Sequence, residues 1–207
     1  MRKASCLIVL CCMVLPVRMA PAQTANPSSV ANPALRKELL HRVEKDQKIR
    51  DEWVKKGVKR VDKSLSARMN AIDSANTARM KEIVRQYGWP GPELVGQDGT
   101  DAAFLLVQHA DHEFQKEMLP FVKKEYQAGK LQGQFYALLL DRVLVREGKP
   151  QIYGTQAKSF DKWKGKEPVL QPIEDEAGVD QRRAAVGLPP LSEYLQSLKQ
   201  AYFPKDK

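Results

Sequence analysis

The sequence predicts a mainly α fold of the α+β class: a helical domain with one small β-hairpin, preceded by a basic helical arm. Apolar residues recur every three or four positions through most of residues 33–127, which is the period of an amphipathic helix. Glycines and prolines interrupt this pattern at intervals typical of helix ends. From residue 143 to residue 156, β-branched residues lie on both sides of a Glu-Gly-Lys-Pro turn, which indicates the hairpin.

Residues 1–22 have the features of a secretory signal peptide. Arg2 and Lys3 precede a short apolar run, and a small-x-small cleavage site ends at Ala22. The run is shorter than the roughly 20 residues that cross a bilayer, and no apolar run of spanning length follows it. We therefore expect an exported protein, periplasmic or secreted after cleavage near Ala22, with no transmembrane segment in the mature chain. A signal anchor is the alternative.

Several common chemistries are excluded by the residues that the mature chain lacks. Cys6, Cys11 and Cys12 all lie in the signal segment, so the mature chain has no disulfide, no thiol nucleophile and no thiolate metal ligand. No Gly-x-Ser-x-Gly elbow and no glycine-rich phosphate loop is present. We therefore do not interpret the chain as a covalent hydrolase or as a nucleotide-dependent enzyme.

A disordered leader over residues 23–32 and a basic helical arm over residues 33–69 are expected next. The leader is rich in Ala, Asn, Pro and Ser, and Asn32-Pro33 is typical of a helix start. Between Arg36 and Arg85 there are 15 Lys and Arg against 8 Asp and Glu. Because acids are interspersed and no aromatics alternate with the basic residues, we interpret the arm as a solvated face and expect no nucleic-acid partner. Weak contact with an anionic envelope surface is the alternative.

The helical domain with the hairpin is expected over residues 70–207. Asp73-Ser74 is the predicted cap of a helix that ends at Gly88. After a rigid Trp-Pro-Gly-Pro turn, one central helix is predicted to begin at Thr100 or Asp101 and to continue through residue 118. An apolar segment, the hairpin, a brief helix over 179–186 and a closing helix over 192–202 complete the domain.

Five short polar motifs follow one another along this domain. They are Gly88-Trp89-Pro90, Gln108-His109-Ala110-Asp111, Asp141-Arg142, Gln151-x-Tyr153-Gly154-Thr155-Gln156, and Asp180-x-Arg182-Arg183 with Gly187-Leu188. In this combination, residues 70–192 resemble the bacterial domain-of-unknown-function family 6624. The resemblance implies no activity, but it implies that the polar motifs belong together.

Metal binding is one chemistry that the central stretch could support. His109 and His112 lie three residues apart, so both could reach one divalent metal ion, zinc or iron, from a helix face. Asp111 points about 100° away from His112 on a helix, so Asp141 or Glu113 would have to add the carboxylate. The spacing differs from the His-Glu-x-x-His of zinc hydrolases. In the alternative, one histidine is hydrogen-bonded within the protein and the other is partly solvated. The sequence therefore leaves open whether the chain binds a metal cofactor.

Acid–base catalysis and ligand binding are the other two interpretations. His109 could act as a general base, with Asp111 or Asp141 fixing its tautomer. A polar cleft could recognise a small polar or anionic ligand through forked arginine donors and neutral amides, with these predicted binding residues: Gln108, Arg142, Gln151, Tyr153, Gln156 and Arg182. For Asp141-Arg142, a buried ion pair that joins the apolar helix to the hairpin is the structural alternative. We predict a binding or interaction module, with a hydrolase or other enzyme that uses His109 and His112 as the alternative.

Overall fold

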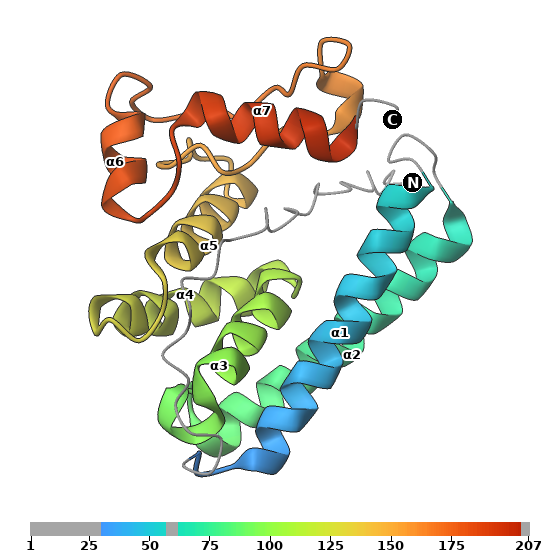
Figure 1. Ribbon diagram of the computed structural model, residues 1–207, viewed down its shortest axis with the longest axis vertical. Coiled ribbons are helices and arrows are strands. Elements are labelled where there is room, and N and C mark those ends of the chain that lie inside the picture. The colour runs from blue at the N-terminus through green and yellow to red at the C-terminus, as the bar shows by residue number, and fades with distance from the viewer. Residues whose placement is uncertain (1–29, 57–61, 204–207) are drawn as a thin grey trace.

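The protein is mainly helical, as the sequence predicts. The computed structural model describes residues 30–56 and 62–203, and the helices are labelled in Figure 1. Within this part of the chain the helices are α1 (Pro33–Lys55), α2 (Lys63–Tyr87), α3 (Pro92–Gln108), α4 (His112–Gln127), α5 (Gly133–Arg146), the 3-10 helix η2 (Phe160–Lys162), α6 (Val179–Ala185) and α7 (Leu191–Tyr202). None of these helices is long and apolar enough to cross a bilayer.

The long helices α1 and α2 lie side by side and begin at the residues that the sequence favours as caps. The Asn32 side chain accepts a hydrogen bond from the Leu35 N–H at 3.0 Å, and Pro33 occupies the first turn. Asp62 caps α2 in the same way, at 2.9 Å from the Leu65 N–H.

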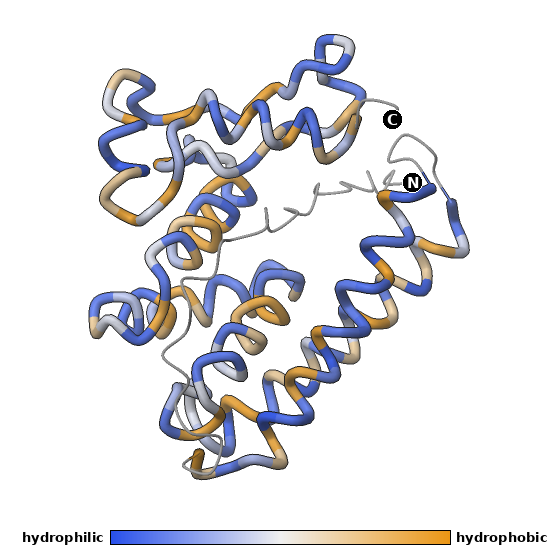
Figure 2. The backbone as a smooth tube through the Cα atoms, in the orientation of Figure 1, coloured by the Kyte–Doolittle hydropathy of each residue, from blue (hydrophilic) through white to orange (hydrophobic). Residues whose placement is uncertain are grey.

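The basic segment packs on the rest of the domain. Leu35 and Leu39 of α1 belong to the same buried core as Phe104, Met118 and Leu139 of the later helices. The boundary expected between residues 69 and 70 lies within α2, which is continuous from Lys63 to Tyr87. Hydrophobic and hydrophilic positions alternate along α1 and α2, as expected for helices that bury one side (Figure 2).

Ion pairs between acidic and basic side chains connect α1 to α2. One of these ion pairs leads to a testable prediction about the pH dependence of stability. Glu38 accepts hydrogen bonds from Arg79 at 2.8 Å and from Arg42 at 2.9 Å. The hydrogen bond from Arg79 is the main cause that holds the pKa of Glu38 at about 2, below its ordinary value of 4.5. A depressed folded-state pKa contributes stability that is complete above the unfolded pKa and is lost as the pH falls through the folded pKa.

The free energy of unfolding of the wild type should therefore fall more steeply than that of Glu38→Gln between pH 4.5 and pH 2. Urea unfolding at several pH values checks this, with the exposed Glu44→Gln on the same helix as the matched control. Parallel pH profiles for the wild type and Glu38→Gln would contradict it.

One central helix was expected, and the structure corrects this to two helices separated by a break. Helix α3 ends at Gln108, and α4 begins at His112. Asp111 adopts an extended conformation, with φ −62° and ψ 159°, and its side chain accepts from the Phe114 N–H at 2.8 Å. An aspartate that caps a new helix satisfies an N–H that has no partner in the helix, and this local bond replaces the continuous helical ladder. The Asp73-Ser74 cap is also wrong, because both residues lie inside α2.

The predicted β-hairpin is wrong. Val143 and Val145 belong to α5, where Phe135, Leu139 and Val143 recur every four residues on the buried side. Burial of this stripe outweighs the weak strand preference of the β-branched residues. The expected second strand is an irregular segment in which Gln151 forms a single parallel bridge to Ile173.

A second, aromatic cluster joins the C-terminal part to the end of α1. It contains Trp163 together with Tyr194, Leu198 and Tyr202 of α7. Trp53 of α1 contacts this cluster, with its ring centroid 6.4 Å from both Phe160 and Tyr202. The contact brings the C-terminal end of α1 to α7, as Figure 1 shows.

Candidate functional site

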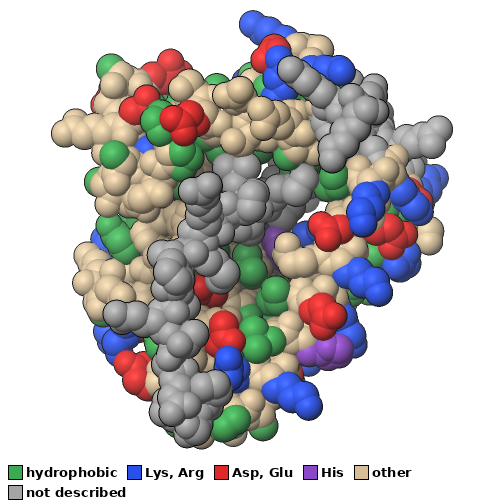
Figure 3. All heavy atoms as spheres, viewed as in Figure 1, with side chains coloured by type: hydrophobic (Ala, Val, Ile, Leu, Met, Phe, Trp, Pro, Cys, Tyr) green, Lys and Arg blue, Asp and Glu red, His purple; other side chains and the backbone are tan. Residues whose placement is uncertain are grey.

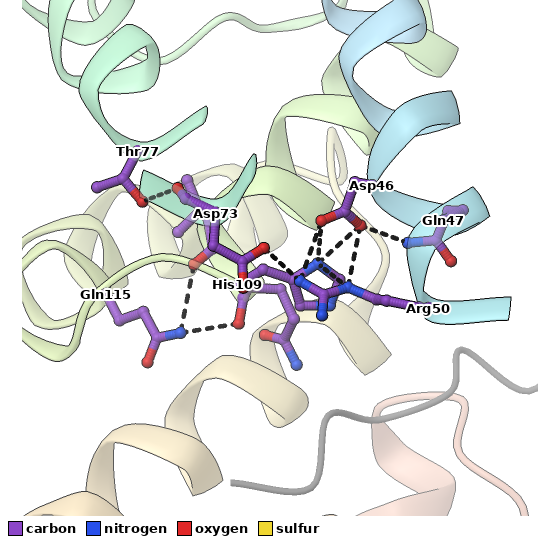
Figure 4. A network of polar contacts seen from close by, with 9 residues as sticks. Asp46, Gln47, Arg50, Asp73, Thr77, His109 and Gln115 are labelled. Atoms are coloured by element: carbon purple, nitrogen blue, oxygen red, sulfur yellow. Dashed lines mark hydrogen bonds and ion pairs between the residues drawn. The ribbon is translucent and has the colours of Figure 1, made fainter. Parts of the chain in front are cut away.

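Four ionisable side chains from three helices meet in the interior. Asp46 and Arg50 are one turn apart on α1, Asp73 comes from α2, and His109 is the C-cap residue directly after α3. The Asp46 oxygens lie 3.0 and 2.9 Å from Nδ1 of His109. Arg50 Nη2 donates to Asp46 at 3.0 Å and to Asp73 at 2.6 Å. Figure 4 shows these side chains pointing toward one another.

This cluster is unusual because its charges are buried. The exposed fractions of the side chains are 0% for Asp46, 4% for His109, 12% for Arg50 and 22% for Asp73. Charged residues are seldom buried to this extent unless they are paired. Taking them out of water is unfavourable, and mutual hydrogen bonding offsets that penalty.

The two carboxylates have opposite pKa shifts. Burial acts to raise the pKa of Asp46, but the hydrogen bond and charge of His109 and the charge of Arg50 outweigh it, so the pKa lies below its ordinary value. For Asp73 burial dominates and the neighbouring Asp46 adds to it, so the pKa of Asp73 is raised. The histidine and the arginine therefore favour the ionised form of Asp46, whereas burial favours the neutral form of Asp73.

The position of Asp46 selects the tautomer of His109. A carboxylate only accepts hydrogen bonds, so a proton on Nδ1 is required for the bond to Asp46. The Arg50 Nε–H is directed at the same ring nitrogen at 3.0 Å and at Asp46 Oδ2 at 3.2 Å, so when Nδ1 is protonated the Asp46 carboxylate is the acceptor that this N–H keeps. With Nδ1 protonated, the lone pair of a neutral His109 is on Nε2, and that nitrogen is the basic one.

A metal ion does not fit this set of side chains as they stand. Asp46, Asp73 and His109 each offer a ligand atom, and these atoms lie within 4.8 Å of one another. However, Arg50 donates to both carboxylates, so its guanidinium already supplies the positive charge between them. The one such group found among the described residues does not contain His112, which the sequence had paired with His109.

The residues that were expected to orient His109 have other positions. Asp111 caps α4 and pairs with Lys81 at 3.0 Å, with half of its side chain exposed. His112 is the first residue of α4. The actual partner, Asp46, was missed. Its signal in the sequence is a carboxylate in line with the apolar residues that α1 buries, namely Leu35, Leu39 and Ile49.

Asp141 organises a different polar group. Its carboxylate on α5 accepts from the N–H groups of Ile152 at 2.7 Å, Tyr153 at 3.0 Å and Thr155 at 2.9 Å, and from the Thr155 hydroxyl at 2.9 Å. Burial raises the pKa of Asp141, and these donated hydrogen bonds oppose the rise. The carboxylate thus fixes the segment after α5.

Most of the predicted binding residues belong to this same group and bond within the protein. Gln151 Nε2 donates to the carbonyls of Gln156 and Gln171, and its Oε1 accepts from the Gln156 N–H. Gln156 Nε2 donates to the Thr155 hydroxyl. Arg182 donates to the Ile152 carbonyl and pairs with Asp175. Arg142 is buried beside Asp141 on α5, and Tyr153 is partly buried.

The molecule is hollowed on the face shown in Figure 3. The hollow lies beside the α1–α2 pair, and hydrophobic side chains and part of one histidine side chain are visible in it. A recess with apolar walls and a few polar groups is the usual form of a small-molecule site.

A family model described as "Family of unknown function (DUF6624)" matches residues 33–207, which confirms the resemblance found in the sequence. No curated protein and no solved structure matches the chain.

Proposed function

Because the chain belongs to DUF6624, a family of unknown function, we propose its activity from the site itself. The chain is an enzyme in which His109 is the general acid and base and Asp46 is its positioning residue. The observation that carries this proposal is the buried Asp46 carboxylate at 2.9 Å from Nδ1 of His109. Ionisable groups with shifted pKa values in a recess are typical of catalytic sites.

The proton transfers follow from the tautomer of His109. Neutral His109 takes a proton at Nε2 from a water molecule or a hydroxyl group of the substrate. The ionised Asp46 stabilises the imidazolium that forms, as the carboxylate does in a catalytic triad. The oxygen that loses this proton forms a bond to the reacting atom of the substrate, and the bond from that atom to the leaving group breaks as His109 returns the proton to the leaving group. Positioned proton transfer of this kind contributes typically 10²–10⁴-fold to a rate.

Binding of a small polar ligand is the first step of this activity. The cleft expected from the sequence used the polar atoms of Gln151, Gln156 and Arg182, which bond to other parts of the protein. This favours the enzyme interpretation over the binding module, because the His109 group is the polar cluster whose geometry resembles catalytic machinery.

Turnover of chromogenic esters, phosphate esters and glycosides by the full mature chain tests the proposal. His109→Gln and Asp46→Asn should each lower the rate on a responsive substrate by about 10²-fold or more. The matched control is His41→Gln, because the His41 side chain is 61% exposed on α1. Equal rates in the wild type and in both site variants would overturn the assignment.

We also infer that the chain is exported, from the signal-like composition of residues 1–22. Cell fractionation and N-terminal sequencing of the purified protein test this. A mature chain that begins near Gln23 in the exported fraction would support it, and an intact Met1 in the cytoplasmic fraction would contradict it.

A further inference from the structure

The junction of α3 and α4 contains polar side-chain atoms that are buried without a hydrogen-bond partner. Gln108 is 2% exposed, and neither its Nε2 nor its Oε1 has a partner. Gln115 is fully buried and its Oε1 also has none, and the same holds for Nδ1 of His112. Four such atoms therefore come from three residues within one turn of the junction.

The Gln115 side chain is held against the backbone at the end of α3. Gln115 Nε2 donates to the carbonyl of Gln108 at 2.8 Å, which ties α4 to the end of α3. His112 lies three residues before Gln115, and residues at this spacing share one side of a helix. Figure 4 shows Gln115 directed toward the end of α3 that carries His109.

An unpaired buried polar atom is unfavourable, so such atoms in native proteins mark a place for water or a ligand. The chemistry of the unpaired atoms selects the ligand. The amide of Gln108 has one donor group and one acceptor side by side, and both are unpaired. A primary carboxamide or the edge of a cyclic amide presents the complementary acceptor and donor at the same spacing.

We infer that Gln108 and Gln115 form a recognition site for a neutral carboxamide group beside His109. The two hydrogen bonds from Gln108 would orient the ligand, and Gln115 Oε1 would accept a further N–H. This inference rests on the proposed function only in taking the carboxamide to be part of the substrate. A carboxylate lacks the donor that Gln108 Oε1 needs, and a ketone lacks it as well.

Acetamide is the probe, with acetone and acetate as controls of nearly equal size that lack the N–H donor. The side-chain NH₂ signals of Gln108 and Gln115 in ¹H–¹⁵N spectra of the full mature chain report binding. We expect saturable shifts with acetamide, with an affinity on the order of millimolar for so small a ligand. Gln108→Met should weaken acetamide binding about tenfold or more, and the exposed Gln127→Met is the matched control.

Stability distinguishes this site from a place for a structural water molecule. Because Met replaces unpaired polar atoms with an apolar group of similar shape, the urea midpoint of Gln108→Met should stay unchanged or rise. A lowered midpoint together with no saturable acetamide shift would show a bound water molecule and overturn the inference. Equal shifts with acetone or acetate would overturn the ligand class.

Two variants test the proposed acid–base function separately from the amide site. Asp46→Asn should still bind acetamide, because Asp46 is not part of the amide site. Saturable acetamide binding combined with unchanged turnover in Asp46→Asn and His109→Gln would uphold the amide site and reject the acid–base role.

Discussion

Asp46→Ala is expected to lower the free energy of unfolding by about 3–5 kcal/mol, which is typical when one member of a buried ion pair is removed. The Asp46 carboxylate bonds to both His109 and Arg50, and its side chain is fully buried. Without it the Arg50 guanidinium keeps Asp73 as a partner, but His109 loses the acceptor for Nδ1. Chemical denaturation with urea measures the effect.

Asp51→Ala is the matched control for Asp46→Ala, because Asp51 is exposed on the same helix. Its effect should be within about 0.5 kcal/mol, as for most surface substitutions. Asp46→Asn keeps the shape of the side chain and should destabilise less than Asp46→Ala. A loss under about 1 kcal/mol for Asp46→Ala would show that the four ionisable groups are not an interdependent network.

Asp141→Ala should have an effect of similar size for a different reason. Three backbone N–H groups and one hydroxyl donate to this carboxylate, and Asp141 is fully buried. Each buried donor left without an acceptor is unfavourable by about 1–3 kcal/mol. The variant should therefore lose at least about 3 kcal/mol of stability, as measured by urea unfolding.

Hydrogen exchange gives a second, local measurement of the same effect. The amides of Ile152, Tyr153 and Thr155 should lose more protection in Asp141→Ala than those of α1. Glu174→Ala is the control, because Glu174 is exposed in the same C-terminal region. Unchanged protection at these three amides would show that the Asp141 hydrogen bonds do not hold the segment in place.

The sequence predicted those features that depend on neighbouring residues. The Asn32 cap, the Gly88 stop and the helix near residues 179–186 are confirmed, because each depends on a local bond or on backbone conformation. The prediction of a β-hairpin was wrong, although the residues of its turn were suitable. The residues before the turn pack in the core as the end of α5, and this burial outweighs local preference.

For the candidate site too, the sequence predicted one part and missed another. His109 stood out as the residue most suited to acid–base chemistry, but the composition of its own segment suggested the wrong carboxylates. Asp46 lies 63 positions earlier in the chain, and only the packing of α1 against α3 brings it to His109. Local spacing places Asp46 on the buried side of α1, but it does not identify His109 as the partner.

What the sequence by itself determined is a helical protein with a signal-like start, no cysteine after residue 12, and a polar centre near His109. These properties follow from composition and from the period of the apolar residues. Only the tertiary structure decided which carboxylate meets His109, and it showed that Asp141 and Gln151 hold a segment of the protein in place. The physical reason is that a buried polar group takes the partner that the packed helices bring within reach, wherever that partner lies in the chain.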